Sequence, residues 1–346
     1  MKAQSPTNHK KMSILVYVGL DRLGDGLLKL PFVRGLRQAW PDAHITWLAG
    51  KEDSVYGGVL RSLVTNYIDE VIDFGGIGVH PSELLRPVAG GKFRGRTFDL
   101  IIDSQKIVWS SLSLMRIRHN RFISPAARFL LSSTKPEKGY RFPKSMQRQL
   151  LDLLELCSGQ RFPTPTRLNL DIPPQMIADA ETIWSPNGPS VALAPGAGGL
   201  PKCWPLQRFI DVAQGLCNQG VSVAFILGPQ ELHWLEHLAA ACPQASFPLQ
   251  NDYIVKKYGF SPFFTMALAG RFDKGLANDA GVAHLLAIGG LALVILYGPT
   301  VPEKFRPMGK KIKIIEARDY GAREMSAIPF GRVYDALLSE TGTGSE

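Results

Sequence analysis

Residues 191–205 read VALAPGAGGLPKCWP, and residues 276–300 read LANDAGVAHLLAIGGLALVILYGPT. Each stretch begins as a short apolar run, typical of a buried strand, and continues into a loop of small residues with one charged side chain. Small residues let backbone N–H groups approach oxyanions closely, and a helix N-terminus after the loop adds a favourable dipole. Together with the positive charge of Lys202, the two stretches predict a phosphate-bearing ligand, a nucleotide or nucleotide-sugar.

Strand and helix patterns alternate on both sides of these stretches. In the first half we expect strands at 13–19, 43–49, 70–74 and 98–103, and helices at 26–39 and 144–158. In the second half we expect strands at 191–194, 222–227, 274–277 and 292–297, and helices at 206–219, 231–241, 263–269 and 280–288. This alternation predicts the α/β class with open, mostly parallel sheets.

A change of composition marks the domain boundary. Residues 161–174 and 185–189 are rich in Pro, Asn and Ser, and a short helix at 175–184 separates them. We therefore expect one Rossmann-like domain at 1–170 and a second at 171–325, facing each other across a cleft. A C-terminal helix and polar tail at 326–346 are expected to pack back on the N-terminal domain.

The chain is basic overall, and much of the excess lies in one segment. There are 39 Lys and Arg against 30 Asp and Glu in 346 residues, a net charge of +9. In residues 116–148, which we call the basic segment, arginines and lysines are interleaved with Phe and Tyr. Such a segment can meet nucleic acid, anionic lipid headgroups or a phosphorylated saccharide, and the alternative is a solvated, mobile loop.

Targeting signals and metal-binding cysteines are not evident. The apolar run 14–20 is too short for a secretory signal, and the longest apolar run, 285–297, falls short of a membrane span. The four cysteines have neither C-x-x-C nor zinc-ligand spacing, which favours reduced thiols: Cys157, Cys203, Cys217 and Cys242. We expect a cytoplasmic protein with peripheral contact to the inner face of the membrane through the basic segment.

Four motifs together resemble a known family. They are ILVYVGLDRLGDGLLKLPFVRGLRQAWPDAHITWLAG at 14–50, APGAGGLPKCWPLQRF at 194–209, LGPQE at 227–231 and NDAGVAHLLAIGGLALVILYGPT at 278–300. They look like the heptosyltransferases of lipopolysaccharide core assembly, glycosyltransferase family nine, over most of the chain except 77–142. The resemblance implies a GT-B architecture and inverting transfer from a nucleotide-sugar, typically ADP-heptose, to a lipopolysaccharide-core or related glycan acceptor.

Two residues are candidates for catalysis. Asp25 follows the first strand, so its carboxylate could take the proton of an acceptor hydroxyl, while the alternative role is a helix N-cap. Lys202 could stabilise the diphosphate leaving group as its charge grows, and the alternative is an ordinary surface lysine. The resemblance matches Asp25 to the family's catalytic aspartate in a GD motif and Lys202 to a phosphate-contacting position.

Further residues are expected to bind the donor. The glycine loop contributes Gly196, Ala197 and Gly198, and the second loop contributes Asp279, Ala280, Gly281 and His284. The alternative for the second loop is an Asp N-cap followed by a core histidine. Ala280 and Ala283 depart from the family, which often has a hydroxyl residue and a larger or polar residue there. Glu231, with Gln230 as a competitor, could accept hydrogen bonds from ribose hydroxyls, and 298–300 should line the same cleft.

On the acceptor side, charge alone points to Arg22, Arg118, Arg121 and Arg128, which could meet the phosphates of an anionic glycolipid or glycan.

Residues 196–203 lack the G-K-[ST] ending of a P-loop, and we find no convincing D-x-D motif for a divalent ion. We therefore expect a metal-independent transferase without a cofactor and without a nucleic acid partner.

Two other classes of function stay open. His233, Glu236 and His237 fit H-x-x-E-H, the helix of an inverted zinc metallopeptidase. Against a peptidase, no clear third-ligand helix follows, and Trp234 and Leu238 supply a packing stripe on the same helix. The second alternative is a non-catalytic module that binds a nucleotide-sugar or RNA through the basic segment.

Overall fold

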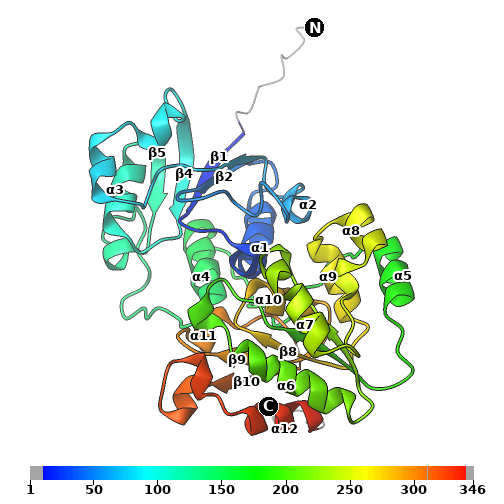
Figure 1. Ribbon diagram of the computed structural model, residues 1–346. Coiled ribbons are helices and arrows are strands. Elements are labelled where there is room, and N and C mark those ends of the chain that lie inside the picture. Colours follow the sequence, from blue (N-terminus) through cyan, green and yellow to red (C-terminus); the bar gives the residue numbers. More distant parts are fainter. Residues whose placement is uncertain (1–10, 310, 340–346) are drawn as a thin grey trace, which may run out of the picture. The chain divides into compact units, whose positions relative to one another are not determined.

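The computed structural model describes residues 11–309 and 311–339, and the chain divides into two compact units, Met1–Thr164 and Pro165–Glu346. Each unit contains one five-stranded sheet with parallel pairing throughout (Figure 1). The predicted α/β class with parallel sheets is confirmed. The division lies at 164, whereas the composition change suggests 170.

The first sheet has the order β3-β2-β1-β4-β5. Its strands are β1 Ser13–Val18, β2 His44–Ala49, β3 Glu70–Ile72, β4 Thr97–Asp103 and β5 Arg118–Ile123. The chain moves outward from β1 to β3 and returns to the other side of β1 with β4. In open parallel sheets, ligands bind at the carboxyl ends of the strands where the order reverses, which here is between β1 and β4.

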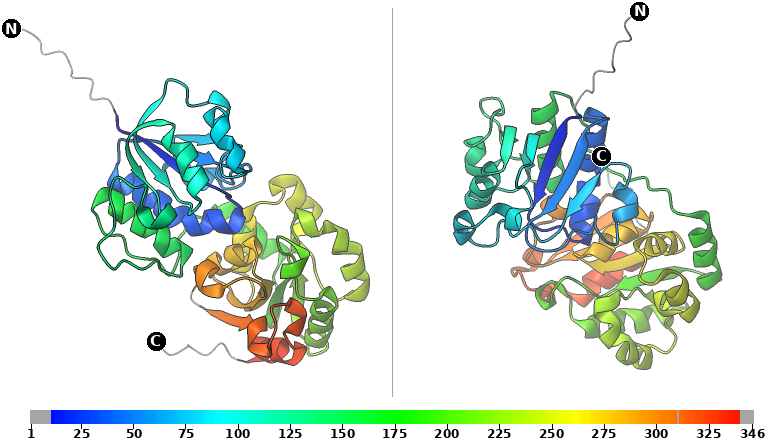
Figure 2. Two further views of the ribbon diagram at one scale, coloured as in Figure 1. Left: turned by 90° about the vertical axis from the view of Figure 1, so that its left-hand side faces the viewer. Right: turned by 90° about the horizontal axis from the view of Figure 1, so that it is seen from above.

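Helices cover both faces of the first sheet. The α-helices are α1 Leu23–Ala39, α2 Arg61–Val64, α3 Val108–Met115 and α4 Met146–Ser158, and the 3-10 helices are η1 Pro81–Leu85, η2 Val88–Gly91 and η3 Ala126–Phe129. Helices α1 and α4 pack together on one face, and α3 lies with η1 on the other (Figure 2). Gly35 permits the α1–α4 contact, because a Cβ there would overlap the side chain of Leu154.

The start of α1 differs from the expectation. The predicted helix at 26–39 begins instead at Leu23, because the Arg22 carbonyl already accepts a hydrogen bond from the Gly26 N–H at 2.8 Å. Asp25 is therefore the third residue of the helix, and Arg22 occupies the N-cap without a side-chain cap hydrogen bond. The interpretation of Asp25 as an N-cap, and its placement in a loop before the helix, were wrong.

The basic segment is built into the fold over much of its length. It contains β5, η3 and the beginning of α4. Arg148 pairs with Asp152 at 2.7 Å and with Glu155 at 2.6 Å, and Arg121 donates to the Cys157 carbonyl at 3.2 Å. The alternative of a solvated loop is therefore wrong for these parts.

A buried ion pair holds the loop between β1 and α1. Asp21 and Lys29 are both buried, and the Lys29 Nζ lies 2.8 Å from Asp21 Oδ1 and donates to the Leu20 carbonyl at 2.8 Å. The other carboxylate oxygen accepts from Trp47 Nε1 of β2 at 2.8 Å and from Ser54 Oγ. One carboxylate thus connects the first loop, α1, β2 and the chain after β2.

A second buried carboxylate, Asp103, ends β4. It accepts hydrogen bonds from Ser111 Oγ at 2.6 Å, Ser124 Oγ at 2.8 Å and the Gln105 N–H at 2.8 Å. Burial nevertheless raises the pKa of Asp103 from 3.8 to about 6, because these donors offset only part of the desolvation of the charged form.

The second sheet has the order β10-β9-β8-β6-β7. Its strands are β6 Ser190–Ala194, β7 Ser222–Phe225, β8 Lys274–Asn278, β9 Ala292–Tyr297 and β10 Ile312–Glu316. The strand order reverses between β6 and β8, so the carboxyl ends of these two strands are the expected ligand edge of this unit.

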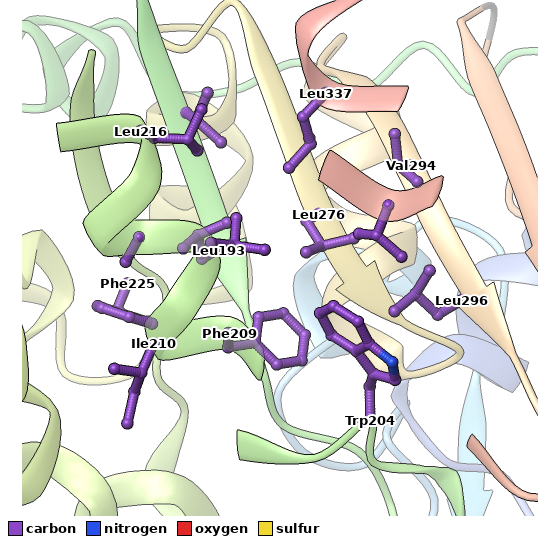
Figure 3. Close-up of a cluster of buried hydrophobic side chains, with 14 of the residues drawn as sticks. Leu193, Trp204, Phe209, Ile210, Leu216, Phe225, Leu276, Val294, Leu296 and Leu337 are labelled. Atoms are coloured by element: carbon purple, nitrogen blue, oxygen red, sulfur yellow. The ribbon is translucent and has the colours of Figure 1, made fainter. Parts of the chain in front are cut away.

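The second unit has a core on each face of its sheet. Its α-helices are α5 Pro174–Ile183, α6 Leu206–Cys217, α7 Leu235–Ala241, α8 Asp252–Tyr258, α9 Pro262–Ala269, α10 Gly281–Ile288, α11 Pro302–Phe305 and α12 Phe330–Leu338. Its 3-10 helices are η4 Leu200–Lys202, η5 Pro229–Trp234, η6 Pro248–Gln250, η7 Ala317–Tyr320 and η8 Met325–Ala327. One core lies under α6 and α12, and Figure 3 shows Trp204 and Phe209 beside Leu276 of the sheet.

The C-terminal helix belongs to this second core. Val333, Ala336 and Leu337 of α12 are buried in it, and α12 contacts α6, β8 and β9. We expected residues 326–346 to pack back on the N-terminal domain, whereas α12 packs within the second unit because its apolar face completes that core. Residues 340–346 lie outside the described residues. No helix in the described part of the chain is long and apolar enough to cross a membrane.

We expect Asp21→Asn to lower the free energy of unfolding by about 3–5 kcal/mol, because it leaves the Lys29 ammonium buried without its counter-charge. Chemical denaturation would measure the change. The matched control is Glu52→Gln, which removes the exposed Arg22–Glu52 pair of the same region and should cost at most about 1 kcal/mol. Equal losses in the two variants would contradict a stabilising role for the buried pair.

Asp103 should make stability depend on pH. Between pH 4 and 6 the folded protein keeps a proton on Asp103 that the unfolded chain has released. The contribution of Asp103 to the free energy of unfolding is therefore complete below its ordinary pKa of 3.8. That contribution is lost as the pH rises through 6. The loss amounts to about 3 kcal/mol. Asp103→Asn should remove this part of the slope, which denaturation curves at several pH values would reveal; an unchanged slope would refute the assignment.

Candidate functional site

Lys202 and Asp279, the charged residues of stretches 191–205 and 276–300, meet at the carboxyl ends of β6 and β8, the expected ligand edge of the second sheet. Lys202 Nζ lies 3.0 Å from Asp279 Oδ2, and the Thr300 hydroxyl donates to the same oxygen at 2.6 Å. Asp279 is buried, whereas the Lys202 side chain is 36% exposed. The contacts join the loops after β6, β8 and β9, and the half-buried Lys202 and Thr300 are the members that solvent or a ligand can reach.

Buried anchors place these loops. Asn278, at the end of β8, donates from Nδ2 to the Pro195 carbonyl at 2.7 Å and accepts from the Trp204 N–H at 3.1 Å. The Trp204 indole is buried and donates to the Ile328 carbonyl at 3.0 Å. Lys202 therefore lies two residues before an immobilised side chain, which restricts where its ammonium can be.

The glycine loop opens stepwise to solvent. Gly196 is buried, Ala197 is half-buried and Gly198 is exposed. A Cβ at Gly196 would overlap the Glu231 carboxylate, so glycine is required there for Glu231 to approach the loop. The structure thus brings Glu231 against the glycine loop, and its role toward ribose hydroxyls stays a prediction.

Glu231 is itself held by the backbone. Its Oε2 accepts from the Gly228 N–H at 3.0 Å, so Glu231 reaches back to the N-cap residue of η5. Burial raises the pKa of the Glu231 carboxyl above its ordinary value. A carboxylate held in this way has a fixed direction, which suits recognition of a hydroxyl pair.

The loop after β8 leads directly into α10. Ala280 is the N-cap of α10 and makes no side-chain cap, and Gly281 is the first helical residue. The first-turn N–H groups of a helix need acceptors from elsewhere, and an anion is a suitable acceptor. The alternative in which Asp279 caps the helix is wrong, because Asp279 precedes the N-cap and accepts from Lys202 and Thr300 instead.

His284 is buried in the first turns of α10. Burial lowers its pKa to about 4, while the Asp279 carboxylate raises it and the Lys202 ammonium lowers it. The imidazole is therefore neutral at physiological pH. Its Nδ1 has no hydrogen-bond partner among the described residues. The alternative of a core histidine with its hydrogen bonds satisfied is therefore wrong for His284.

In the first unit, Asp25 lies at the corresponding edge of its sheet. It is half-buried in the first turn of α1, after the carboxyl end of β1, where the helix dipole favours a negative charge. Gly26 allows this turn to pack closely, because a Cβ there would meet Val55. Gln105, which follows β4, lies against Gly19 of the same loop. Sequence reasoning did not single out Gln105, because only the folded sheet brings it beside the β1 loop.

The four acceptor-side arginines are separated in the structure. Arg22 pairs with Glu52 at 3.3 Å, and Arg128 follows the carboxyl end of β5 in an exposed left-handed turn with φ of 55°. Arg118 begins β5 and pairs in register with Thr97 at the amino end of β4. Because the strands are parallel, Arg118 lies at the opposite edge of the sheet from Asp25, and Arg121 is occupied with the Cys157 carbonyl.

The H-x-x-E-H motif does not form a single helix. Residues 229–234 form the 3-10 helix η5, and α7 begins at Leu235, so the predicted helix at 231–241 is divided between His233 and His237. Within residues 11–309 and 311–339, no three His, Cys, Asp or Glu side chains gather as metal ligands would. The motif therefore lacks the geometry of a peptidase zinc site.

Comparison with known proteins gives the family. A model of glycosyltransferase family 9 (heptosyltransferase) matches residues 90–327, which is more than half of the chain. The chain belongs to glycosyltransferase family 9. The matched residues include Lys202, Glu231 and the loop from Asp279 to His284, whereas Asp25 precedes them.

One curated relative matches over a shorter stretch. Lipooligosaccharide heptosyltransferase 2 of Haemophilus influenzae is 28% identical over 129 residues. The alignment spans 37% of this chain and 36% of that protein, so the chain matches little more than a third of that relative's length.

Solved structures match nearly the whole chain. ADP-heptose lipopolysaccharide heptosyltransferase II of E. coli has a TM-score of 0.62 at 19% identity, covering 94% of this chain and 98% of that one. The family 9 glycosyltransferase of Veillonella parvula has a TM-score of 0.66 at 21% identity, covering 94% and 96%. E. coli heptosyltransferase WaaC with ADP has a TM-score of 0.63 at 17% identity, covering 94% and 99%. These matches establish the fold, and the predicted GT-B class is confirmed.

Thr300→Val should lower the free energy of unfolding by about 1–3 kcal/mol, because it removes one hydrogen-bond donor from the buried Asp279 carboxylate. Thr300→Ser, which keeps the hydroxyl, is the matched control and should cost less than about 1 kcal/mol. Chemical denaturation would measure both values. Equal losses in the two variants would show that the hydroxyl does not stabilise the Asp279 carboxylate.

Proposed function

We propose that this chain is an inverting glycosyltransferase that moves a sugar, heptose from ADP-heptose, to an acceptor of the lipopolysaccharide core or a related glycan. In this proposal Asp25 is the general base, and Lys202 stabilises the diphosphate leaving group. The first unit activates the acceptor, and the second unit binds the donor.

The observation that carries the proposal is the group formed by Lys202, Asp279 and Thr300 at the ligand edge of the second sheet. Departure of a nucleoside diphosphate builds negative charge on the oxygen that leaves the sugar. A half-exposed ammonium held at 3.0 Å from a buried carboxylate is already oriented, so it can meet that charge without reorganising. The uncapped amides of α10 supply further positive dipole at the same loop.

The proposed chemistry is a single displacement. The acceptor oxygen attacks the anomeric carbon on the face opposite the diphosphate, and the bond between that carbon and the diphosphate oxygen breaks. The electron pair of the broken bond goes to the leaving diphosphate, and the acceptor's proton goes to the Asp25 carboxylate. One displacement inverts the anomeric configuration. The residues supply the positive charge themselves, so the proposed mechanism uses neither a divalent metal nor a cofactor.

Donor recognition divides among the remaining residues. Gly196, Ala197 and Gly198 would let backbone amides approach the diphosphate, and Glu231 beside Gly196 would accept from the ribose hydroxyls. Gly281 gives the same close approach at α10, next to Ala280. The neutral imidazole of His284 would form a hydrogen bond with a donor oxygen rather than an ion pair. Support for ADP-heptose comes from the named relatives, one of which, E. coli WaaC, was solved both with ADP and with ADP-2-deoxy-2-fluoro heptose.

The acceptor is proposed to be an anionic glycolipid or glycan reached on the cytoplasmic face of the inner membrane. Of the four candidate arginines, Arg22 at the N-cap of α1 and Arg128 after β5 lie at the same sheet edge as Asp25 and are the better candidates for acceptor phosphates. Arg118 is at the opposite edge, and Arg121 supports α4.

Asp25→Asn should reduce kcat by about 10²–10⁴-fold while ADP-heptose affinity stays unchanged, because the amide cannot accept the acceptor's proton.

Lys202→Met should lower both kcat and donor affinity, because the lysine contacts the diphosphate before and during its departure. Release of ADP measures turnover, and titration of the inactive variants measures donor affinity.

The matched control is Asp42→Asn, an exposed carboxylate beyond the other end of α1, which should leave turnover unchanged. Full turnover in Asp25→Asn would eliminate the assigned base. If ADP-, GDP- and UDP-sugars all bind without any turnover in the unsubstituted chain, the binding-module alternative is correct. Comparing thermal stabilisation by the three nucleotides identifies the base recognised.

A further inference from the structure

Helix α3 presents three of its five apolar residues outward, although Leu114 is buried in the core. Its sequence is VWSSLSLM, and its buried residues include three serines, Ser110, Ser111 and Ser113. Val108, Leu112 and Met115 are between 38% and 42% exposed, and their spacing of four and three places them on one side of the helix. A surface helix that packs on a core normally has the reverse arrangement.

The inward direction of one of these serines has a clear structural cause. Ser111 Oγ donates to the buried Asp103 carboxylate at 2.6 Å, where the carboxylate needs hydrogen-bond donors. Ser110 Oγ donates to the Ile107 carbonyl at 2.8 Å, within its own turn.

The 3-10 helix η1 extends this apolar stripe. Arg116, at the end of α3, donates to the Leu84 carbonyl at 2.9 Å and to the Glu83 carbonyl at 3.3 Å, which holds η1 beside α3. Leu85 is 89% exposed. We call the set of Leu85, Val108, Leu112 and Met115 with the cations Arg86, Arg116 and Arg118 the α3–η1 surface; Figure 1 shows α3 at the margin of the first unit.

The charge of this surface is positive. Arg86, Arg116 and Arg118 are exposed, and the hydrogen bonds of Arg116 described above go to neutral carbonyl oxygens. Glu83 is the acidic residue of η1, and its carboxylate accepts from the N–H groups of Gly78, Val79 and His80. The acid is thus directed at its own backbone, and the arginines are left to face solvent.

We infer that the α3–η1 surface docks on an anionic bilayer. Arginines beside exposed aliphatic side chains match the boundary of such a bilayer, where guanidinium groups meet lipid phosphates and aliphatic groups enter the acyl region. Arg116 and Arg118 are the first cations of the basic segment, so this inference keeps the membrane contact at its first residues and moves it away from the part beyond β5. The surface goes beyond the transfer reaction, because it concerns where the enzyme is held rather than what it transfers.

The test uses vesicles of phosphatidylglycerol and phosphatidylethanolamine, with phosphatidylcholine vesicles for comparison and neither donor nor acceptor present. The full chain should float with the anionic vesicles and not with the neutral ones. Replacing Leu85, Leu112 and Met115 by Gln should lower the partition coefficient about tenfold or more. Replacing Arg86 and Arg118 by Gln should remove the preference for anionic lipid and the sensitivity to salt.

Two matched variants act as controls. Ile177→Gln with Val255→Gln removes two exposed apolar side chains of the second unit, and Lys135→Gln with Lys138→Gln removes two exposed cations of the basic segment. Both should bind vesicles as the unsubstituted chain does. All variants should keep the same melting temperature and the same stabilisation by ADP, which separates this test from that of the proposed function.

The inference is overturned if the unsubstituted chain binds anionic and neutral vesicles equally or binds neither, as a surface meant for a protein partner would. It is also overturned if the Leu85, Leu112 and Met115 variant, folded by these measures, binds anionic vesicles undiminished. A misfolded triple variant leaves the arginine variant to decide, because its substitutions are at exposed positions.

Discussion

One carboxylate oxygen, Asp279 Oδ2, joins three loops of the second unit. It is bonded to Lys202 from the loop after β6 and to Thr300 from the loop after β9, while the Asp279 N–H donates to the Leu296 carbonyl of β9. Parallel strands bring their carboxyl ends to one edge, so loops that are distant in sequence can share one residue. The geometry of the group formed by Lys202, Asp279 and Thr300 depends on this oxygen, because Lys202 has no comparable fixed position without it.

The first unit uses the same pair of residue types for another purpose. Asp21 and Lys29 are both buried, so removing either partner leaves a charge without solvent or counter-ion, and the penalty falls on the fold. Lys202 is 36% exposed, and a pair so accessible to water contributes little to stability. The difference in burial therefore separates a pair that holds a loop from a pair available to a ligand, although the two pairs look alike in sequence.

The sequence predicted what depends on local pattern. The strand at 292–297 was predicted with the bounds it has, because a continuous run of apolar residues between glycines has few other interpretations. The start of α1 was placed three residues late, because Arg22 is not a capping residue type. The strand β5 was missed, because its sequence RHNRFI lacks an apolar run at its beginning.

Contacts between distant residues could not be read from the sequence. Asp21 was not predicted as the centre of a buried network, because its partners Trp47 and Ser54 are 26 and 33 residues away. Thr300 was expected near the donor, but its bond to Asp279 spans 21 residues. Helix α3 was missed for a related reason. Three of its buried positions are serines, one of which, Ser111, donates to Asp103, whereas a pattern search expects apolar residues at buried positions.

The composition of α3 cannot be explained by the interior alone. Ser111 is buried on its inner face because an uncompensated buried carboxylate is more costly than burying a serine that donates to it. Val108, Leu112 and Met115 are the apolar residues that this helix exposes, each between 38% and 42%. Single exposed apolar residues are ordinary on protein surfaces, but a set on one helix face beside Leu85 and three arginines is a patch. The composition of the patch is therefore explained by what it contacts. The surface of an anionic bilayer, with charged headgroups above an apolar interior, matches both its arginines and its aliphatic side chains.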